Sequence, residues 1–343
     1  MGVDLVDIIP EESTTLDSLS NKTLAVDAYN TLYQFLAIIR QPDGTPLKDR
    51  NGRVTSHLSG LLYRTANLAE KGIKLAFVFD GKPPELKEME ISRRREVKEK
   101  AIVHYERALR KGKMQEARTY AQATSRLKDL MVDDAKRLLN ALGVSWVQAP
   151  SEGEAQAAFI AARGDVWGVA SQDHDSLLFG APRMVKNLAI TGRRKLPRRD
   201  AYVEVEPKIV ELAKVLNGLS LTREQLVDVG ILIGTDFNPD GVKGIGPKTA
   251  VKLIQENGNL ENVMAKNPEV RISPDVNTIR RIFIDPAVTQ DYVLKWSKPN
   301  EDEVVAFLCG ERDFSEDRVR RAVSKMVTVA SSAKKATLDS YFG

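Results

Sequence analysis

The chain has 343 residues, of which 42% are hydrophobic and 29% are charged, and its formal net charge is +4. Such a chain can bury a substantial core, as one large domain or two entangled ones, and its composition is that of a soluble globular protein. No apolar run approaches the roughly 20 residues that a membrane span needs, and the N-terminus lacks the pattern of a signal peptide. The single cysteine, Cys309, excludes an internal disulfide and fits a reducing cytosol. With only three histidines beside it, the chain has no material for a zinc site of the usual type.

Three apolar runs predict buried strands that end at acids. They are Thr23–Tyr29 with Asp27, Lys74–Gly81 with Asp80, and Val166–Ala170, which is followed by Asp173 and Asp175. Helical patterns separate them, at Thr31–Arg40, His57–Lys71 and Val132–Leu142. This alternation predicts a parallel sheet with crossover helices. The acids then share the carboxyl edge of the sheet, where ligands collect in open α/β folds.

The stretch from Pro150 to Phe179 carries two acid-x-acid pairs around an alanine-rich helix pattern. The pairs are Glu152 with Glu154, and Asp173 with Asp175. Each pair has a simpler interpretation, because Ser151-x-x-Glu154 matches a capping box and the aspartates could be turn residues. Paired carboxylates repel one another, however, and hard divalent cations relieve that repulsion. Together with the acids at the other two strands, the pairs favour a shared metal site.

The segment from Glu85 to Lys128 is basic, with 13 Lys/Arg against seven Asp/Glu. Within it, Ile91–Arg110 and Met114–Leu130 have helical patterns that are too polar to lie deep in a core. One interpretation is a solvated helical hairpin, since charge runs are usually solvated faces. The other is a basic clamp over single-stranded nucleic acid. Thr191–Asp200 packs five cations into a turn-like segment, which we expect at a rim that touches DNA.

A glycine-rich turn follows the next predicted helix. The motif Thr222-x-x-Gln225 matches a capping box that opens this helix, and Asp236 lies at its far end. Within Gly241–Ile254, Gly244 and Gly246 let the backbone approach a phosphate closely, and the following helix start offers free N–H groups. These features indicate a helix-hairpin-helix contact with a DNA backbone, and a plain tight turn is the alternative.

The C-terminal part alternates helices and turns from Pro268 to Lys325, with no recognisable chemistry. Residues Ala330–Ala336 are small and charged, which predicts a disordered tail. The final segment, ATLDSYFG, is an apolar and aromatic island in that tail. Such islands commonly dock into a pocket of a partner protein.

Together these motifs resemble the flap structure-specific endonucleases of the replication and repair 5′-nuclease superfamily, and the archaeal members most of all. The resemblance runs essentially from Met1 to Gly343, and it rests on MGV, AVDAYNTLYQFL, YRTANL, VFDGKPPELK, PSEGEAQAA, SQDHDSLLFG and GTDFNPDGVKGIGPK. It implies an α/β fold with a parallel-rich central sheet flanked by helices (a PIN-like 5′-nuclease core), a basic helical arch and a helix-hairpin-helix element. The implied parts are an N-terminal nuclease region (1–98), the arch (99–130), an internal nuclease region with the hairpin (131–258), a C-terminal helical part (259–328) and a flexible tail (329–343).

The resemblance also implies the site residues. Seven acids of the family hold two divalent ions, normally Mg²⁺ with Mn²⁺ as a substitute, and the matching positions are Asp27, Asp80, Glu152, Glu154, Asp173, Asp175 and Asp236. The first four are assigned mainly to one ion and the last three to the other. Lys87 and Arg94 match the catalytic cations that steer and neutralise the scissile phosphate. The implied DNA-binding residues are Gly2, Tyr33 (under a stacked base), Arg40, Arg64, Glu152, Gly234, Asp236, Gly244, Gly246 and Lys248. A monovalent cation, usually K⁺, is implied at Val242–Ile245.

The implied function is cleavage of 5′-flap DNA near the flap junction by two-metal-ion phosphodiester hydrolysis, with an accompanying 5′-to-3′ exonuclease activity. It serves Okazaki-fragment maturation in replication, and repair. The implied partners are flap and nicked duplex DNA and a PCNA-type sliding clamp, bound through Leu338, Tyr341 and Phe342. Lys335 stands where the family has Gln, which alters the polar anchor of that peptide. We expect a monomer in the cytoplasm of a prokaryotic cell, associated with the nucleoid and with no membrane.

His174, between two of the acids, has no metal role in the resemblance. We expect it to face scaffold or solvent, because alternate residues near a strand end point in opposite directions. Two other classes of function stay open. A PIN-type ribonuclease has a four-acid core but lacks the glycine-rich hairpin and the clamp-binding tail. A non-catalytic DNA-binding scaffold has no need of all seven acids.

Overall fold

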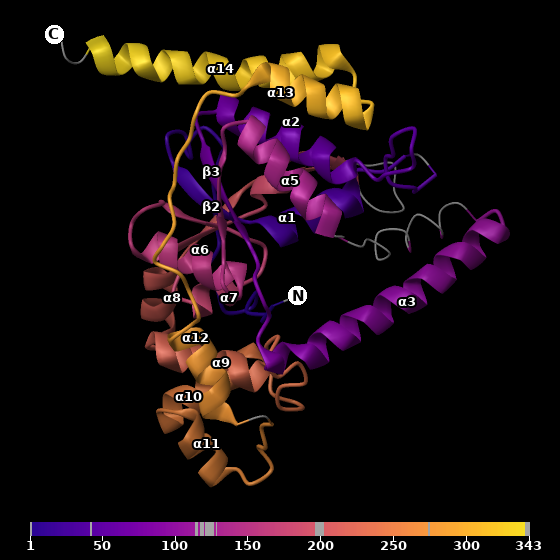
Figure 1. Ribbon diagram of the computed structural model, residues 1–343. Helices are drawn as coiled ribbons and strands as arrows, with labels where there is room; N and C mark the ends of the chain where they lie inside the picture. Colours follow the sequence, from indigo (N-terminus) through magenta and orange to yellow (C-terminus); the bar gives the residue numbers. More distant parts are fainter. Residues whose placement is uncertain are drawn as a thin grey trace.

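The computed structural model describes residues 2–41, 43–113, 116, 120, 127, 129–195, 202–273 and 275–339. A mostly parallel sheet lies at its centre (Figure 1). Its strands in spatial order are β1 (Glu12–Ser13), β9 (Lys208–Glu211), β6 (Arg183–Lys186), β5 (Gly168–Ala170), β2 (Thr23–Asp27), β3 (Lys74–Phe79) and β4 (Ser145–Gln148). The strands from β6 to β4 run parallel, while β9 is antiparallel to β6 and β1 to β9. A separate hairpin pairs β7 (Gly192–Lys195) with β8 (Tyr202–Val205).

The central strands are continuous apolar runs because both faces of the sheet are buried. Leu24 and Val26 of β2 pack into the core on one face, and Ala25 between them packs into the core on the other. In β3, Phe77 and Val78 are divided between the two cores in the same way. A sheet with helices on both faces requires apolar residues at successive positions. The predicted parallel sheet with acids at its carboxyl edge is therefore confirmed.

Helices cover the two faces and extend the molecule at both ends (Figure 1). On one face lie α1 (Ala28–Ile38), α2 (Ser56–Glu70), α5 (Asp129–Ala141), α13 (Glu301–Val305), the π-helical turn η3 (Ala306–Gly310) and α14 (Glu316–Asp339). The core on the other face includes α6 (Gly153–Ala162), α7 (Asp175–Leu178) and α8 (Leu212–Leu219). It continues into α9 (Arg223–Ile233), α10 (Pro247–Asn257), α11 (Leu260–Lys266) and α12 (Val276–Ile284), which form the lower end of the molecule in Figure 1. Two 3₁₀ turns, η1 (Glu85–Lys87) and η2 (Leu188–Ile190), complete the described elements. No helix among the described residues combines the length and the apolarity needed to cross a membrane.

An extended segment, residues 286–300, joins α12 at the bottom of Figure 1 to α13 at the top. It is fixed to the sheet layer on its way. The indole N–H of Trp296 donates to the Leu75 carbonyl at 2.7 Å, and the Ser297 N–H donates to the Gly143 carbonyl at 3.0 Å. The chain thus returns along the whole molecule after the helix-hairpin-helix region and packs its last helices on α2 and α5.

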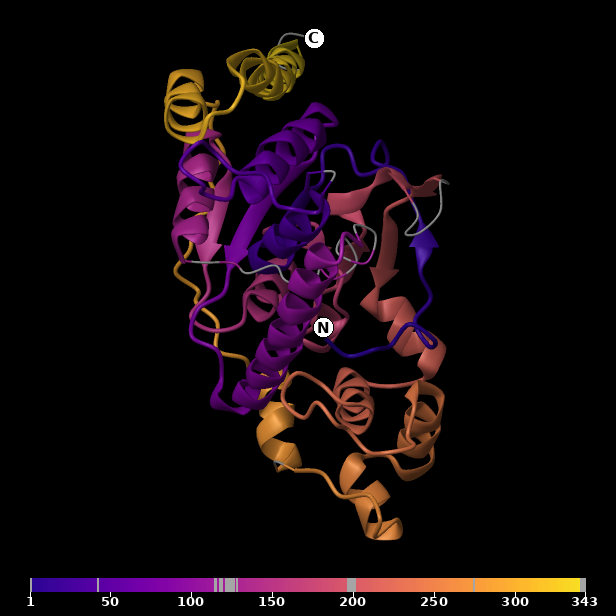
Figure 2. The same ribbon diagram turned by 90° about the vertical axis from the view of Figure 1, so that its right-hand side faces the viewer.

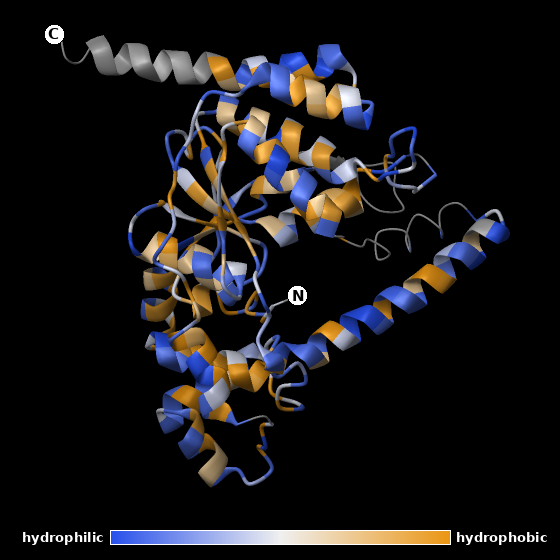
Figure 3. Ribbon diagram, in the orientation of Figure 1, coloured by the Kyte–Doolittle hydropathy of each residue, from blue (hydrophilic) through white to orange (hydrophobic). Residues whose placement is uncertain are grey.

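Helix α3 (Glu88–Arg110) leaves the body of the molecule at its first turns and projects away from it (Figures 1 and 2). Hydrophilic residues dominate its surface in Figure 3, in contrast to the strands. Ala101 and Ala108 are its buried hydrophobic residues among those described. The predicted polar helix at Ile91–Arg110 is therefore confirmed, and it begins slightly earlier. Most of the second predicted helix, Met114–Leu130, lies outside the described residues.

The structure confirms the predicted start of α9 and differs from the sequence patterns at Ser151 and at residues 192–195. Thr222 and Gln225 form the predicted reciprocal capping box of α9. The structure excludes the simpler interpretation of Ser151-x-x-Glu154 as a capping box, because the N-cap of α6 is Glu152 and the Ser151 hydroxyl donates to the Lys82 carbonyl. The segment at 192–195 is a strand rather than a turn, since β8 supplies a pairing partner.

The C-terminal tail also differs from the expectation of disorder. Helix α14 continues through residues 330–336 to Asp339, because alanine and lysine are strong helix formers even without an apolar face. Of the proposed clamp-binding residues, Tyr341 and Phe342 lie outside the described residues, and so does the side chain of Leu338.

Candidate active site at the carboxyl edge of the sheet

Strand ends deliver four of the seven predicted metal ligands. They are Asp27, the last residue of β2, Asp80 after β3, and Asp173 and Asp175 after β5. Asp27 also caps α1, since its Oδ1 accepts the Asn30 N–H at 2.9 Å. Asp80 Oδ1 accepts the Gly153 N–H at 2.6 Å, which ties the end of β3 to the start of α6. Backbone amides thus fix one oxygen of each of these two carboxylates.

The other three acids come from helix ends on the second face of the sheet. Glu152 caps α6, Glu154 lies in the first turn of α6, and Asp236 follows α9. Glu154 Oε1 accepts the Ser171 hydroxyl at 2.6 Å, so its side chain points toward the sheet edge instead of closing a helical turn. The structure therefore directs Glu154 to the site that the sequence predicts.

Mutual repulsion shows that these acids share one site. Burial, and after it the charges of Asp80 and Asp173, raise the pKa of Asp27 well above its ordinary value. Burial and the charges of Asp173 and Asp27 do the same to the pKa of Glu154. Carboxylates raise one another's pKa in this way only when they lie close together in a poorly solvated site.

Charge repulsion also shows that Asp80, Glu152, Asp175 and Asp236 lie close to other acids of the site. Burial and the charge of Glu152 raise the pKa of Asp80 to about 6. Burial and the charge of Asp236 raise the pKa of Asp175 to about 7. Each of the seven predicted ligands is therefore electrostatically coupled to at least one other.

Two cations from the start of the arch lie among the acids. The Lys87 ammonium donates to Glu152 and lies 3.3 Å from Asp236. Burial alone would lower the pKa of Lys87, but Glu152 and Asp236 overcome it and raise that pKa. Arg94 Nη2 donates to Asp236 at 2.6 Å, and Arg94 Nε donates to Glu90 at 2.8 Å. The structure thus brings both predicted catalytic cations to the acid cluster.

The donor chemistry fits hard divalent cations. All seven predicted ligands are carboxylates, the ligand type that Mg²⁺ and Mn²⁺ prefer. The raised pKa values of Asp27 and Glu154 report uncompensated negative charge. In the described part of the chain, no three acidic, histidine or cysteine side chains converge tightly enough to grip a single ion in their present orientations. Coordination of one ion depends on individual side-chain rotamers, whereas the mutual repulsion of the acids reflects the position of the whole cluster.

Tyr33 on α1, Arg40 just after α1 and Arg64 on α2, three of the predicted DNA-binding residues, differ in accessibility. The Tyr33 ring is covered by the Lys98 ammonium of α3, 4.5 Å from the ring centroid. Arg40 Nη1 donates to the Gly44 carbonyl at 2.8 Å. Arg64 turns inward, where its Nε donates to the Leu188 carbonyl at 3.0 Å, and burial lowers its pKa to about 10. Arg64 is therefore less available to a phosphate than the sequence suggests.

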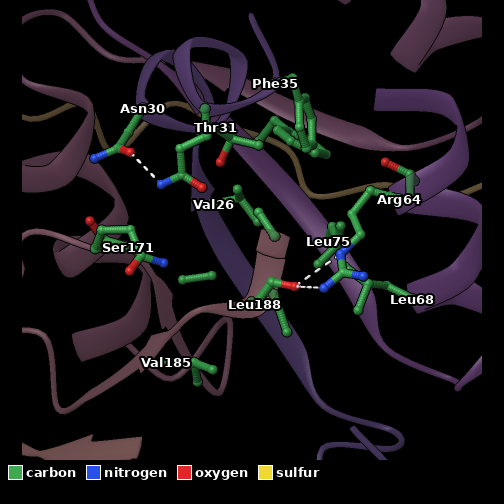
Figure 4. Close-up of a pocket in the computed structure, with 16 residues that line it drawn as sticks. Val26, Asn30, Thr31, Phe35, Arg64, Leu68, Leu75, Ser171, Val185 and Leu188 are labelled. Atoms are coloured by element: carbon green, nitrogen blue, oxygen red, sulfur yellow. Dashed lines mark hydrogen bonds between the residues drawn. The ribbon is translucent and has the colours of Figure 1, made fainter. Parts of the chain in front are cut away.

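Figure 4 shows Arg64 and Asn30 on the wall of a small cavity between α1, α2 and the sheet. The cavity has a volume of about 20 Å³, room for little more than one water molecule. Asn30 Nδ2 donates to Asp173 Oδ2 at 3.1 Å, and Gln34 Nε2 donates to Asn30 Oδ1 at 2.8 Å. The sequence analysis did not predict the contact between Asn30 and Asp173. Its only sequence signal is the position of Asn30, one helical turn after Asp27.

Gly2, Gly234 and Gly244 occupy positions that need glycine, Gly244 because its φ is +87°. A Cβ on Gly2 would lie 2.6 Å from the Asp175 carboxyl group. Gly234 has φ +112° and packs its Cα against the backbone at Gly241. At Gly244 and Gly246, in the turn between α9 and α10, a Cβ would meet nothing within 4 Å, so that backbone faces open space. Lys248, in the first turn of α10, is exposed beside it.

His174 faces the scaffold, as predicted. It is only 3% exposed, and its Nε2 lies 3.2 Å from the Lys186 ammonium. Burial and the charge of Lys186 lower its pKa. Its imidazole contacts no acid of the described cluster.

Two family models match the chain, and between them they contain all seven acids. The XPG N-terminal domain matches residues 1–101, and the XPG I-region matches residues 143–236. The fold and the site therefore define a nuclease of the XPG type.

Relatives that match the whole chain show which XPG-type nucleases it resembles. Flap endonuclease 1 of Hyperthermus butylicus is 57% identical over 95% of this chain and 94% of its own. Flap endonuclease 1 of Caldivirga maquilingensis is 56% identical over 100% of both chains. Among solved structures, flap endonuclease-1 from Methanococcus jannaschii is 41% identical, covers 97% of this chain and 100% of its own, and has a TM-score of 0.77. The catalytic core of Rad2 in complex with DNA substrate, at 24% identity and a TM-score of 0.68, shares the fold.

The chain belongs to the flap endonuclease 1 family. It is a structure-specific flap endonuclease of DNA replication and repair, a DNA phosphodiester hydrolase, and its family consists of metal-dependent nucleases. The predicted resemblance, fold class and enzyme class are confirmed.

Proposed function

We propose that the seven carboxylates hold two divalent ions, normally Mg²⁺, and that this site hydrolyses the backbone of 5′-flap DNA near the flap junction. The observation that carries the proposal is the mutual electrostatic coupling of seven carboxylates delivered by separate parts of the chain. When bound, such ions supply an activated water and stabilise the leaving oxygen. The same site then removes nucleotides from 5′ ends at nicks and gaps, the accompanying exonuclease activity.

Lys87 and Arg94 steer and neutralise the scissile phosphate in this proposal. Glu152 and Asp236 hold both cations at the acid cluster, so their charge is already at the place where the phosphate arrives. Tyr33 stacks a base beside the cleaved bond. Such stacking requires Lys98 to leave the ring face that it covers.

The turn between α9 and α10 binds the backbone of the duplex. The open backbone at Gly244 and Gly246, the N-terminus of α10 and the exposed Lys248 together suit a phosphate. A monovalent cation, normally K⁺, is held in the same turn at Val242–Ile245. This contact is independent of base sequence, as recognition of a flap by its shape requires.

The arch that begins with α3 encloses the single-stranded 5′ flap. Its start is fixed over the acids by Lys87 and Arg94, and the rest of α3 is polar and projects from the body (Figure 1). A solvated helical hairpin has no need of that attachment to the acid cluster.

Beyond DNA, the partner is a sliding clamp of PCNA type. The tail offers it Leu338, Tyr341 and Phe342, with Lys335 in place of the usual Gln. We further propose that the protein acts as a monomer at the nucleoid.

The test is Asp173→Asn in single-turnover cleavage of a labelled 5′ flap with Mg²⁺. Cleavage is abolished while flap affinity in Ca²⁺ stays near that of the wild type, because affinity comes mostly from phosphate contacts elsewhere. Asp302→Asn, an exposed acid on α13, is the matched control. Wild-type cleavage by Asp173→Asn removes this residue from the site, and preferential cutting of an RNA flap favours the ribonuclease alternative.

A further inference from the structure

The first residues of the chain are hydrogen-bonded to the start of α7, where Asp175 lies. Val3 is 2% exposed, and its N–H donates to Asp175 Oδ1 at 2.7 Å. Its carbonyl lies 3.3 Å from Nδ1 of His174. Because His174 and Asp175 are consecutive, one dipeptide grips both polar backbone groups of Val3. Gly2 allows this approach, since any side chain there would collide with the Asp175 carboxylate.

The second ring nitrogen of His174 fixes its tautomer. Nε2 lies 3.2 Å from the Lys186 ammonium, which can only donate, so Nε2 carries a lone pair and Nδ1 carries the hydrogen. The Nδ1–H then donates to the Val3 carbonyl. Lys186 also pairs with Glu11, and Lys208 holds Glu11 at 2.6 Å. Glu11, Lys186, His174, Val3 and Asp175 thus form a series of hydrogen bonds, each with one donor and one acceptor.

The series is shielded from solvent and reaches the edge of the sheet. The His174 side chain is 4% exposed, and those of Lys186 and Glu11 are 12% and 14% exposed. Glu11 directly precedes β1, the edge strand that pairs with β9. The series of hydrogen bonds therefore links the start of β1, at Glu11, to one carboxylate oxygen of Asp175.

We propose that His174 is a positioning residue for divalent-metal binding: through the Val3 peptide it holds Asp175 in the orientation that receives the ion. This inference rests on the proposed metal site, of which Asp175 is a member. Partners that orient metal ligands in this way typically change metal affinity or activity by about 10–100-fold when removed. The hydrogen bond from Val3 occupies Oδ1 of Asp175 and so restrains the rotation of this carboxylate.

The test compares five variants of the full-length protein, the fifth being Asp175→Asn. His174→Leu removes both hydrogen bonds of the ring, whereas His174→Gln can donate to the Val3 carbonyl and accept from Lys186. Lys186→Met removes the cation that fixes the tautomer. Lys214→Met is the matched control, because Lys214 pairs with Glu12, the next residue along the same segment, and contacts no part of the series.

Two measurements are made without DNA. Binding of Mn²⁺, followed by electron paramagnetic resonance, weakens by about tenfold in His174→Leu, less in Lys186→Met, and stays near wild type in His174→Gln and Lys214→Met. Hydrogen exchange of the Val3 amide in metal-free protein accelerates in the same order. Melting temperatures establish that each variant is folded.

Wild-type Mn²⁺ affinity and wild-type Val3 exchange in folded His174→Leu overturn the inference. An equal loss in His174→Gln also overturns it, because that variant keeps both hydrogen bonds. If His174→Leu does not fold, Lys186→Met decides by the same criteria. Asp175→Asn separates the proposed metal site from the proposed role of His174. Wild-type Mn²⁺ affinity in Asp175→Asn contradicts the metal site itself. A loss of affinity in Asp175→Asn alone contradicts only the positioning role of His174.

Discussion

The Lys87 ammonium lies 3.3 Å from the Asp236 carboxylate. Lys87 ends η1 at the base of the arch, and Asp236 follows α9 at the start of the helix-hairpin-helix turn. The same ammonium donates to Glu152 at the start of α6. Three segments that are far apart in sequence therefore meet at one cation, and the position of the arch is coupled to the DNA-binding turn and to the acid cluster.

Replacing Lys87 with alanine is expected to slow the chemical step by roughly 10²–10³-fold, the usual loss when a preorganised group that stabilises the transition state is removed. Single-turnover cleavage at saturating enzyme measures this step, and titration of the flap in Ca²⁺ measures binding, which changes little. Lys22→Ala, at the opposite end of β2, is the control. A loss of affinity that accounts for the whole loss of rate contradicts the assignment.

Lys248→Ala is expected to weaken binding of duplex DNA of any sequence and to reduce the slope of log affinity against log salt by about 0.9, because one phosphate contact is lost. Affinities in Ca²⁺ at several salt concentrations give the slope. Lys266→Ala, exposed at the end of α11, retains the wild-type slope. An unchanged slope in Lys248→Ala means that this lysine contacts no phosphate.

Streptavidin bound to the 5′ end of the flap before the enzyme is added should sharply slow cleavage, because an enclosing arch admits only a free end. The same block added after the enzyme, in Ca²⁺ to prevent turnover, should trap the complex. Cleavage in Mg²⁺ and dissociation rates in Ca²⁺ check the two orders of addition. Equal rates for blocked and free flaps in both orders favour the solvated hairpin over the arch.

Deletion of residues 335–343 should leave cleavage of free oligonucleotides unchanged and abolish stimulation by the sliding clamp, because the tail's apolar residues are expected to bind the clamp and not the active site. Clamp affinity of the full-length and truncated proteins, measured by calorimetry, decides the point. Identical affinities leave the tail without this role.

His57 should make the protein acid-sensitive. It is fully buried, both ring nitrogens lack a hydrogen-bond partner, and burial, reinforced by Arg312, lowers its pKa to about 4. The unfolded chain therefore takes up a proton near pH 6.5, but the folded protein does so only near pH 4, so this stability is present above pH 6.5 and is lost as the pH falls. The loss between pH 7 and pH 5 amounts to about 2 kcal/mol.

Urea unfolding of the wild type and of His57→Leu at both pH values measures this contribution as the difference between their pH dependences. Other titrating groups cancel in that comparison. His104→Leu, an exposed histidine on α3, keeps the wild-type pH dependence. If His57→Leu retains the full wild-type loss of stability at pH 5, protonation of His57 is not its cause.

Local sequence patterns were sufficient for three central strands of the sheet, β2, β3 and β5, and for the acids at their ends, but not for β1, β4, β6 and β9. A buried parallel strand must be apolar at successive positions, so the runs that end at Asp27 and Asp80 predict both the strand and the place where its acid emerges. The motif at Thr222 likewise predicts a helix start, because both partners of its capping box lie within one turn. The prediction of disorder at 330–336 differs from the structure, because the same small and charged residues are compatible with disorder and with helix.

The sequence by itself determined which carboxylates could gather at one sheet edge, and only the tertiary structure decided what orients them. The inward turn of Arg64, the contact of Asn30 with Asp173 and the grip of His174 on Val3 join residues that are distant in the chain. Strand and helix periodicities describe which face of an element is buried, but the direction of a polar side chain depends on which donor or acceptor a remote segment brings within about 3 Å.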